Sequence, residues 1–365
     1  GVINFISKKP REKQALNAII NQSSVGQTNF GVYASRKYRK IGYSILGLAN
    51  FQRAYDVDKD GFSELPKSGS FIFHPTVYFY LSDKTQLSMA NSYANGKNEG
   101  GDMHVIKQGV TNEHNYVEKN ITQRNTSTLE INHKINDKFS LRLKQSLSIF
   151  DRDISIPDYT FDGVNTNVYT ELSASLQQKK HLFNAGANII ADRFRQHGAT
   201  TVFNQGSRSF TSGLYLQDTW DVSSFIIVEM GARLDHVKYT NIVYADKELF
   251  LLPRLSVLFK MNDKLSSRVT GGMGYKAPTI FTEQTETIQY KAVKPISDCR
   301  SEKSSGFTAD VNYKTGNSNQ LSFSINQLFF YTSICKPLIL SRAPSLNWYF
   351  SNAQKPVNST GFETT

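Results

Sequence analysis

Hydrophobic and polar residues alternate with a period of two along most of this 365-residue chain. The clearest run covers 139–149, where Leu141 and Leu143 enclose Arg142, and a similar run follows at 249–260. A period of two places apolar side chains on one face of a β-strand and polar side chains on the other. No stretch of helical periodicity has a convincing length. The sequence therefore predicts an all-β fold.

The longest uninterrupted apolar run is Val77–Leu81. A membrane helix needs about 20 such residues, so we expect no helix of this chain to span a bilayer. The mean hydropathy of −0.41 suggests a soluble protein when it is taken alone. The strands of a membrane barrel alternate, however, and never produce a long apolar run, so this value does not exclude a barrel.

Short polar turns and longer connections follow one another in nearly strict order. A soluble sandwich has no reason to keep its long loops at one end, whereas a membrane barrel has short periplasmic turns and long outer loops. We therefore predict an antiparallel transmembrane β-barrel. The short turns are expected near 38–40, 82–84, 136–138, 178–180, 221–224, 262–264 and 315–319. The longer connections are expected at 53–69, 96–123, 152–167, 197–208 and 277–302.

The pattern gives about sixteen strands between Ala15 and Ala353, with a further strand beginning at Val357. A barrel must close, because an open edge in lipid leaves backbone groups without partners. Sixteen strands would suit a passive porin. The strand at Val357 instead indicates a larger barrel that this chain contains only in part.

Charge and motifs exclude several classes of function. The formal net charge is +11, but the basic residues are scattered rather than clustered, which argues against nucleic-acid binding. The two cysteines form no CxxC or Cys/His constellation, so a zinc site is not expected. Motifs such as GxSxG, HExxH and the P-loop are absent, and we expect no enzymatic activity.

Four segments, in matching order and spacing, resemble segments of TonB-dependent outer-membrane receptors. The first resembles the last plug strand, the second the mid-barrel hairpin, the third the G-F-R-A-P-T-L-F segment that follows it, and the fourth a later N-A-x…T-K-G-x-E hairpin. They depart from the family in one residue, Lys276, where arginine is usual. The segments are Gly1–Pro10, Tyr215–Trp220 with Gly231–His236, Gly274–Phe281, and Asn352–Ala353 with Ser359–Glu363.

The resemblance implies a 22-strand barrel with a plug in its lumen. Residues 1–10 would end the plug domain, and residues 11–365 would form a barrel that is incomplete at its C-terminus. Most of the plug, the TonB box and the closing strands are expected outside this chain. The protein would be a monomer that crosses the outer membrane of a Gram-negative bacterium many times. Its partners would be outer-membrane lipid and, through the plug, TonB.

The resemblance also implies import of a scarce nutrient, for which a ferric siderophore or a related iron complex is the leading cargo. Cobalamin, haem or an oligosaccharide are alternatives on the same machinery. The N-P-N-L-like stretch that often follows the A-P-T-L-F segment is not recognisable between Gln284 and Glu302, which weakens the assignment to haem. A passive sixteen-strand porin is the alternative from another class, and it should have an inward-folded constriction loop and no plug.

No cofactor is required by this scheme, but Asp56–Gly61 in the first long loop has the D-x-D-x-D-G pattern that opens a calcium loop. The twelfth position of an EF-hand would be glutamate, and here it is Lys67. The motif is therefore incomplete, and a solvated acidic hairpin tip is the simpler alternative. The expected Ca²⁺ ligands are Asp56, Asp58, Asp60 and Glu64.

The spacing of the cysteines suggests a disulfide. If the turn at 315–319 centres on Asn317, Cys299 and Cys335 are equally distant from it and face each other across one hairpin. Opposed residues have Cα atoms about 4.5–5.5 Å apart, which a disulfide can bridge. The cell exterior is oxidising. We predict the bond Cys299–Cys335, with two free thiols as the alternative.

Aromatic residues in the predicted outer loops are candidate ligand contacts, because flat side chains bury area at small entropy cost. Packing of the loops on themselves is the alternative for each. His104 and His114 share a loop and could touch haem iron, although a surface position is the plainer interpretation. The aromatic candidates are Tyr55, Phe62, Tyr116, Tyr159 and Phe161. The basic residues expected to face the lumen are Arg142, Lys144, Arg254 and Lys260.

Overall fold

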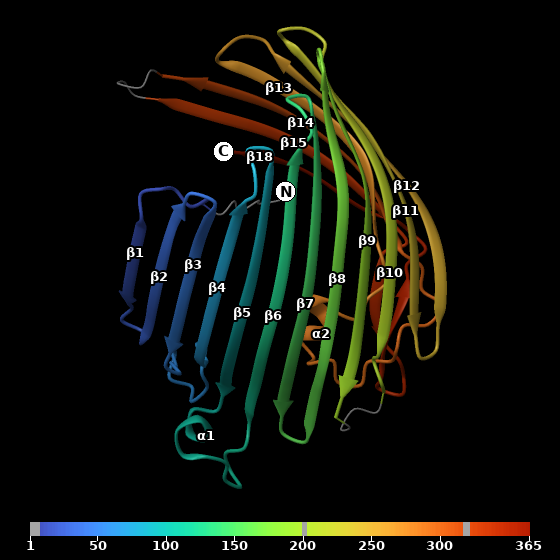
Figure 1. Ribbon diagram of the computed structural model, residues 1–365. Helices are drawn as coiled ribbons and strands as arrows, with labels where there is room; N and C mark the ends of the chain where they lie inside the picture. The colour runs from blue at the N-terminus through green and yellow to red at the C-terminus, as the bar shows by residue number, and fades with distance from the viewer. Residues whose placement is uncertain (1–7, 199–202, 317–321) are drawn as a thin grey trace.

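The computed structural model describes residues 8–198, 203–316 and 322–365. In these residues, sixteen antiparallel strands form one strongly curved sheet, in the order β1 to β15 and then β18 (Figure 1). The strands β16 and β17 form a separate hairpin, and two short helices occupy connections. The predicted all-β antiparallel architecture is confirmed. No helix in this part of the chain is long and apolar enough to cross a membrane.

The strand bounds show how far the alternating pattern extends. The first nine are β1 (Ala15–Gln22), β2 (Gln27–Tyr38), β3 (Ile41–Gln52), β4 (Lys67–Tyr80), β5 (Thr85–Gly101), β6 (Val117–Lys134), β7 (Phe139–Ile156), β8 (Tyr159–Gln178) and β9 (His181–His197). The others are β10 (Ser207–Asp221), β11 (Ile226–Asn241), β12 (Ala245–Lys260), β13 (Leu265–Lys276), β14 (Glu302–Thr315), β15 (Phe323–Cys335), β16 (Leu338–Arg342), β17 (Trp348–Asn352) and β18 (Val357–Thr364). The helices are α1 (Met103–Gln108) and α2 (Glu283–Glu286).

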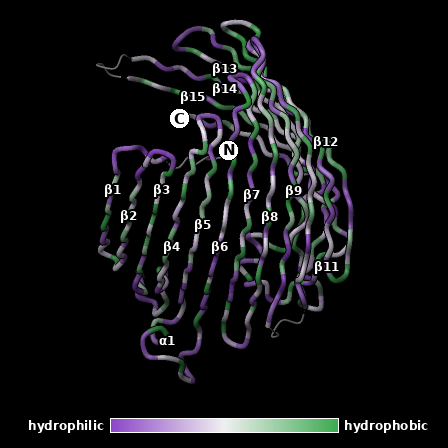
Figure 2. Tube along the Cα trace, in the orientation of Figure 1, coloured by the Kyte–Doolittle hydropathy of each residue, from purple (hydrophilic) through white to green (hydrophobic). Residues whose placement is uncertain are grey.

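The register of the strands joins the apolar residues into one belt. Leu143 on β7 lies opposite Ile131 on β6 and Leu172 on β8. The belt continues from Leu172 to Ala187 on β9 and then to Leu214 on β10. Opposed residues share a face of the sheet, and 61 % of Leu214 is exposed. Figure 2 shows hydrophobic and hydrophilic residues alternating along the strands. This outward face suits lipid rather than water.

The inward face carries a polar network at the level of this belt. Arg233 on β11 donates to Asn188 on β9 at 2.8 Å and to Asp235 at 2.9 Å. The Tyr275 hydroxyl on β13 donates to Asp235 at 3.0 Å. Between these strands, β10 contributes Gly213, which leaves room for the three polar side chains. The buried charge on this face is therefore paired within the wall itself.

The connections confirm the predicted asymmetry for most of the sheet, because short turns gather at one end and most of the longer segments at the other (Figure 1). One predicted long connection, 152–167, is wrong. There β7 continues to Ile156 and β8 begins at Tyr159. Polar residues such as Asp153 lie on the outward face above the apolar belt, while Ile154 is buried on the inward face. The strands thus continue beyond the expected membrane zone, where their sequence has the composition of a loop.

The strand count differs slightly from the prediction, because 338–352 forms the separate hairpin and the sheet's sixteenth strand is β18. The expected plug strand is largely outside the described residues, which begin at Lys8. Pro10 is buried and lies close to Gly42 on β3, where an added Cβ would come within 2.8 Å of the proline ring. The boundary between residues 1–10 and 11–365 stays a prediction.

The inner polar network predicts that Gly213→Ala destabilises the wall. An alanine Cβ would lie within 2.5 Å of Arg233 Nη2 and Asn188 Oδ1, so the network has to shift. The expected loss is about 1–3 kcal/mol, typical of overpacking. The measurement is the temperature above which the protein no longer migrates as a compact species on a gel of unboiled samples. This temperature should be lower for Gly213→Ala than for the unmodified protein. Gly47→Ala is the matched control, because a Cβ there meets nothing within 4 Å. An equal effect of both substitutions would contradict the argument.

Candidate functional site

The principal hydrophobic core lies inside the curved sheet, at the end with the long connections. The connection 277–301, between β13 and β14, folds inward with α2 and packs on the inner faces of β7, β8 and β9. In Figure 1, α2 lies behind β7 and β8. The β16–β17 hairpin joins this core through an isolated bridge between Val293 and Trp348. The core consists of Ile154, Tyr159, Phe161, Phe194, Ile280, Tyr290, Val293, Ile296, Cys299 and Phe350.

Hydrogen bonds from several strands fix the connection 277–301 in place. The Tyr159 hydroxyl on β8 donates to the carbonyl of Gln289 at 3.0 Å. The Asn241 amide, at the end of β11, donates to the carbonyl of Ile296 at 2.7 Å. The Glu248 carboxylate on β12 accepts from the backbone N–H of Ser301 at 3.0 Å. Since a buried backbone group without a partner is costly, these contacts hold the segment rigidly against the wall.

A cavity of about 370 Å³ lies between this connection and the sheet. Five aromatic residues line it: Phe150, and four residues whose rings pack on one another. Phe161 stacks on Tyr290 with ring centroids 4.6 Å apart, and Phe194 meets Phe281 edge to face at 4.8 Å. Gly163 makes this arrangement possible, because a Cβ there would lie 2.5 Å from the Phe194 ring. We call these four residues the mouth aromatics. They offer flat apolar surface to a small molecule.

Charged groups complete the wall of the cavity. Arg152 on β7 forms an ion pair of 2.7 Å with Glu286 of α2. Glu283 and Asn165 also line the cavity. Below it, Asp192 accepts from the Asn165 amide at 2.9 Å. The cavity thus combines an aromatic surface with a few placed polar groups, which is the usual composition of a small-molecule site.

The aromatic ligand candidates fall into two groups. Phe161 lines the mouth cavity, whereas Tyr159 is only 4 % exposed and supports the inward connection. Both begin β8 rather than occupy a loop, so their predicted loop position is wrong. Tyr55, Phe62 and Tyr116 are exposed and belong to the connections 53–66 and 102–116. Ligand binding by any of the five stays a prediction.

Sequence reasoning missed the other contributors to the mouth cavity. Phe194 lies on the strand face that also carries Asn188, and this parity is visible in the sequence. Phe281 and Tyr290 come from an irregular connection, whose inward fold has no periodic signal. The sequence predicts a loop at Arg152, whereas in the structure this residue lies on β7 and its side chain points inward.

The four predicted calcium ligands come together in the connection 53–66. One oxygen from each of Asp56, Asp58, Asp60 and Glu64 lies within 4.8 Å of the others. Asp56 also accepts from the backbone N–H groups of Lys59 at 2.6 Å and Gly61 at 3.1 Å. Gly61 has φ of 94°, which a glycine adopts without strain. The loop geometry suits a hard cation, and Ca²⁺ binding stays a prediction.

The neighbouring connection 102–116 is organised by Asp102. This residue caps α1 by accepting from the His104 N–H at 2.7 Å, and its other oxygen accepts from His114 Nδ1 at 2.6 Å. The His114 hydrogen bond, more than any other contact, lowers the pKa of the Asp102 carboxyl. The rings of His104 and His114 stack at 4.6 Å. Asp102 thus fixes the orientation of the His114 ring through Nδ1, and haem ligation stays a prediction.

The predicted disulfide between Cys299 and Cys335 is wrong in this structure. Cys335 lies opposite Lys303, which moves the centre of the hairpin two residues beyond Asn317. Cys299 precedes β14 and is buried in the mouth core, where its thiol points to the carbonyl of Phe350 at 3.4 Å. Both cysteines are free. Burial raises the pKa of the Cys299 thiol.

The Asp102–His114 contact predicts acid sensitivity of the connection 102–116. A carboxyl whose pKa is lowered on folding stabilises the fold above its ordinary pKa of about 3.9, and this contribution is lost as the pH falls through the lowered value. Pepsin cleavage within 102–116 should therefore increase only below that range. Asp102→Asn keeps a capping side chain but removes the charge, so its cleavage, measured relative to that of an unfolded substrate at the same pH, should become nearly independent of pH. Asp158→Asn, in the β7–β8 turn, should behave as the unmodified protein does. Unchanged pH dependence in Asp102→Asn would disprove the assignment.

Comparison with known proteins supports the architecture. Residues 53–365 match the family model described as TonB dependent receptor-like, beta-barrel. No curated protein matches the chain. Among solved structures, the chain is similar to the closed form of the ferric-catecholate import receptor Fiu from E. coli K12, with a TM-score of 0.73 and 13 % identity over 100 % of this chain and 63 % of that one.

Two further structures have the same fold at similar identity. The copper transporter OprC has a TM-score of 0.77 and 12 % identity, covering 97 % of this chain and 58 % of that one. The FrpB iron transporter from Neisseria meningitidis has a TM-score of 0.74 and 12 % identity, covering 98 % and 59 %. The chain therefore spans less than two thirds of the length of these structures. At these identities, the likeness concerns the fold alone.

Proposed function

Because this chain belongs to the TonB-dependent receptor β-barrel family, we propose that it forms most of the wall and several outer loops of an outer-membrane uptake receptor. The family comprises receptors and transporters of the Gram-negative outer membrane. The observation that carries the proposal is the cavity between the mouth aromatics, on the inward face at the long-connection end. In a barrel with its long loops outside, this is where an external ligand arrives first.

We propose a ferric siderophore or a related iron complex as the cargo. Fiu is described as a ferric-catecholate import receptor and FrpB as an iron transporter, while OprC is described as a copper transporter. Stacked aromatic rings beside Arg152 suit a chelate with planar groups and negative charge. Deeper in the lumen, four basic residues share the inward parity of their strands and would attract an anion: Arg142, Lys144, Arg254 and Lys260. Cobalamin, haem or an oligosaccharide would use the same wall with other contacts.

Transport would depend on TonB acting through a plug segment beyond the described residues. Pro10 is buried beside Gly42 on the inward face of β3, and this position supports a plug that lies on the lumen side of the wall. Ligand bound at the mouth would then pass along the polar inner wall once the plug is displaced. The receptor would act as a monomer surrounded by lipid, without nucleic acid.

The mouth cavity predicts that Phe281→Ala weakens cargo binding. Phe281 contributes a ring to the cavity and is 40 % exposed, so its removal takes away ligand surface without opening the core. Calorimetry of the complete receptor in detergent, with ferric siderophores, haem and cobalamin, should give about tenfold weaker binding of the preferred cargo, equivalent to ~1.4 kcal/mol. Phe210→Ala is the control, because Phe210 is 39 % exposed on the outward face.

The calorimetric panel also decides the cargo. Tight binding of one iron chelate, weakened only by Phe281→Ala, would support both the site and the iron assignment. Binding of cobalamin alone would keep the receptor and overturn iron. Equal weakening by Phe281→Ala and Phe210→Ala would remove the mouth aromatics from the binding site.

A passive porin is the second candidate, because the connection 277–301 folds inward as a constriction loop would. Family membership and the position of Pro10 favour the plugged receptor instead. Single-channel recording of the complete protein in planar bilayers separates the two. A receptor closed by its plug should show no steady conductance, whereas continuous open-channel current would support the porin.

We also propose Ca²⁺ as a structural ion in the connection 53–66. The convergence of Asp56, Asp58, Asp60 and Glu64 supports this, although Lys67 takes the place of the glutamate that closes an EF-hand. The loop is tied to the next connection, since Met103 N–H donates to the Gly61 carbonyl at 2.9 Å. A cation would therefore stiffen both outer loops together.

The calcium proposal predicts that Asp58→Asn with Asp60→Asn abolishes Ca²⁺ binding. Two of the four carboxylates lose their charge, and affinity for a hard cation follows ligand charge. Titration calorimetry at millimolar Ca²⁺ is the measurement. Asp83→Asn with Asp137→Asn, at the short-turn end, should leave binding unchanged. If the unmodified receptor gives no heat of Ca²⁺ binding, the calcium site is disproved.

A further inference from the structure

A group of basic side chains lies on the outward face of the sheet, close to the long-connection end. Arg193 on β9 is directly opposite Arg208 on β10, and Arg195 lies two residues farther along β9 on the same face. On β11, Lys238 lies opposite Phe210, which neighbours Arg208 on the same face of β10. We call Arg193, Arg195, Arg208 and Lys238 the rim cluster. All four side chains are exposed.

The rim cluster has no acidic partner in the part of the chain that the structure describes. Within those residues, none of its four members forms an ion pair. Two carboxylates lie nearby and both have other partners. Asp162, diagonal to Arg195, lies 4.0 Å from His197, and Asp192, which also lines one of the hollows described below, accepts from the Asn165 amide on the inward face at 2.9 Å. Like charges directly opposite each other across two strands are unfavourable. The arrangement is thus suited to a bound anion.

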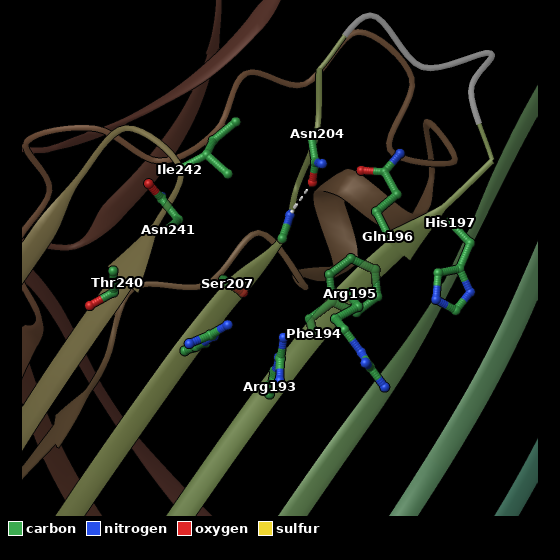
Figure 3. A pocket seen from close by; sticks show the side chains of 12 residues that line it. Arg193, Phe194, Arg195, Gln196, His197, Asn204, Ser207, Thr240, Asn241 and Ile242 are labelled. Atoms are coloured by element: carbon green, nitrogen blue, oxygen red, sulfur yellow. Dashed lines mark hydrogen bonds between the residues drawn. The ribbon is translucent and has the colours of Figure 1, made fainter.

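The surface around the rim cluster is hollowed. Two adjoining hollows, of about 430 and 550 Å³, share Arg193, Arg195 and Arg208 in their walls. Figure 3 shows Arg193, Arg195 and His197 following one another along a strand beside the first hollow. The second hollow extends toward the apolar belt, where Val168, Ala191 and Phe210 line it. The surface is therefore basic at its outer end and apolar below.

We propose that the rim cluster binds the phosphate groups of a phosphorylated lipid headgroup in the outer leaflet of the membrane. Guanidinium groups bind phosphate through paired, charge-assisted hydrogen bonds, and basic pockets beside a lipid-facing surface recognise anionic headgroups. The acyl chains would lie on Val168, Ala191 and Phe210. The inference rests on the proposed membrane location but not on the cargo, because the mouth aromatics face the opposite side of the sheet.

Native mass spectrometry of the complete receptor tests this proposal with bisphosphorylated lipid A and its dephosphorylated form as probes. The phosphorylated lipid should give a retained adduct, and the dephosphorylated lipid should not. Arg193→Gln with Arg208→Gln should lower the bound fraction, by roughly tenfold for each arginine. Arg142→Gln with Lys144→Gln removes the same charge from the inward face of β7 and should leave the adduct intact.

Three results would overturn the proposal: equal adducts with both lipids, an adduct that survives the double arginine substitution, or an equal loss in the inward-face control. Displacement of the lipid by an equal concentration of inorganic phosphate would assign the cluster to free phosphate instead. Folding of each variant is checked by its compact migration on unboiled gels. If the double variant does not fold, the comparison of the two lipids on the unmodified receptor decides. Calorimetry of cargo binding on the same samples separates the two proposals. Cargo binding without a lipid adduct would overturn only the lipid site, whereas a lipid adduct without cargo binding would overturn only the uptake function.

Discussion

Pairing of backbone hydrogen-bonding groups is the constraint on which the rest of this structure depends. In lipid, an unpaired N–H or C=O costs several kcal/mol, so every strand of the wall has to be bonded along its length. That requirement joins the strands from β1 to β18 in one continuous sheet, and their register decides which side chains face lipid and which face the lumen. The belt through Leu143, Leu172 and Leu214 follows from it, as does the inward position of Arg233 and Asp235. Strand parity then sets the rim cluster and the positions of Phe161 and Phe194 in the aromatic cavity.

A wall of this kind has no packed interior of its own, and the hydrophobic core has to form elsewhere. It forms at the mouth, where the connection 277–301 and the β16–β17 hairpin cover the inner ends of β7, β8 and β9. The strands reach that region because they continue beyond the apolar belt. Ile154 and Phe161 face inward there, while acidic residues on the alternate positions face outward. The extended strands thus supply the rigid support on which the mouth aromatics are placed.

The period-two pattern was sufficient to predict the fold class, the short turns and the lumen-facing basic residues, because each depends on local alternation. The pattern does not predict the register of a strand pair. In the hairpin of β14 and β15, the register places Cys335 opposite Lys303 rather than opposite Cys299, the partner expected from the sequence. The sequence predicts a loop at Tyr159 and Phe161, because polar residues precede and follow them where the strands continue beyond the membrane zone. The fold of 277–301 could not be predicted, as its position depends on contacts such as Tyr159–Gln289 and Asn241–Ile296 between distant parts of the chain.

Two zones of the inner wall differ in how far their polar groups are already hydrogen-bonded within the wall, and this bears on the proposed uptake function. In the lumen, Arg233, Asn188 and Asp235 bond to one another, so a ligand on the proposed path would gain little by displacing those contacts. At the mouth, Phe161 and Tyr290 offer ring surface beside the Arg152–Glu286 pair, which can be shared with an anionic ligand. Under the proposed function, capture would therefore begin at the mouth aromatics. The basic residues of the inward strand faces, Arg142, Lys144, Arg254 and Lys260, would then offer the next contacts for an anion deeper in the lumen.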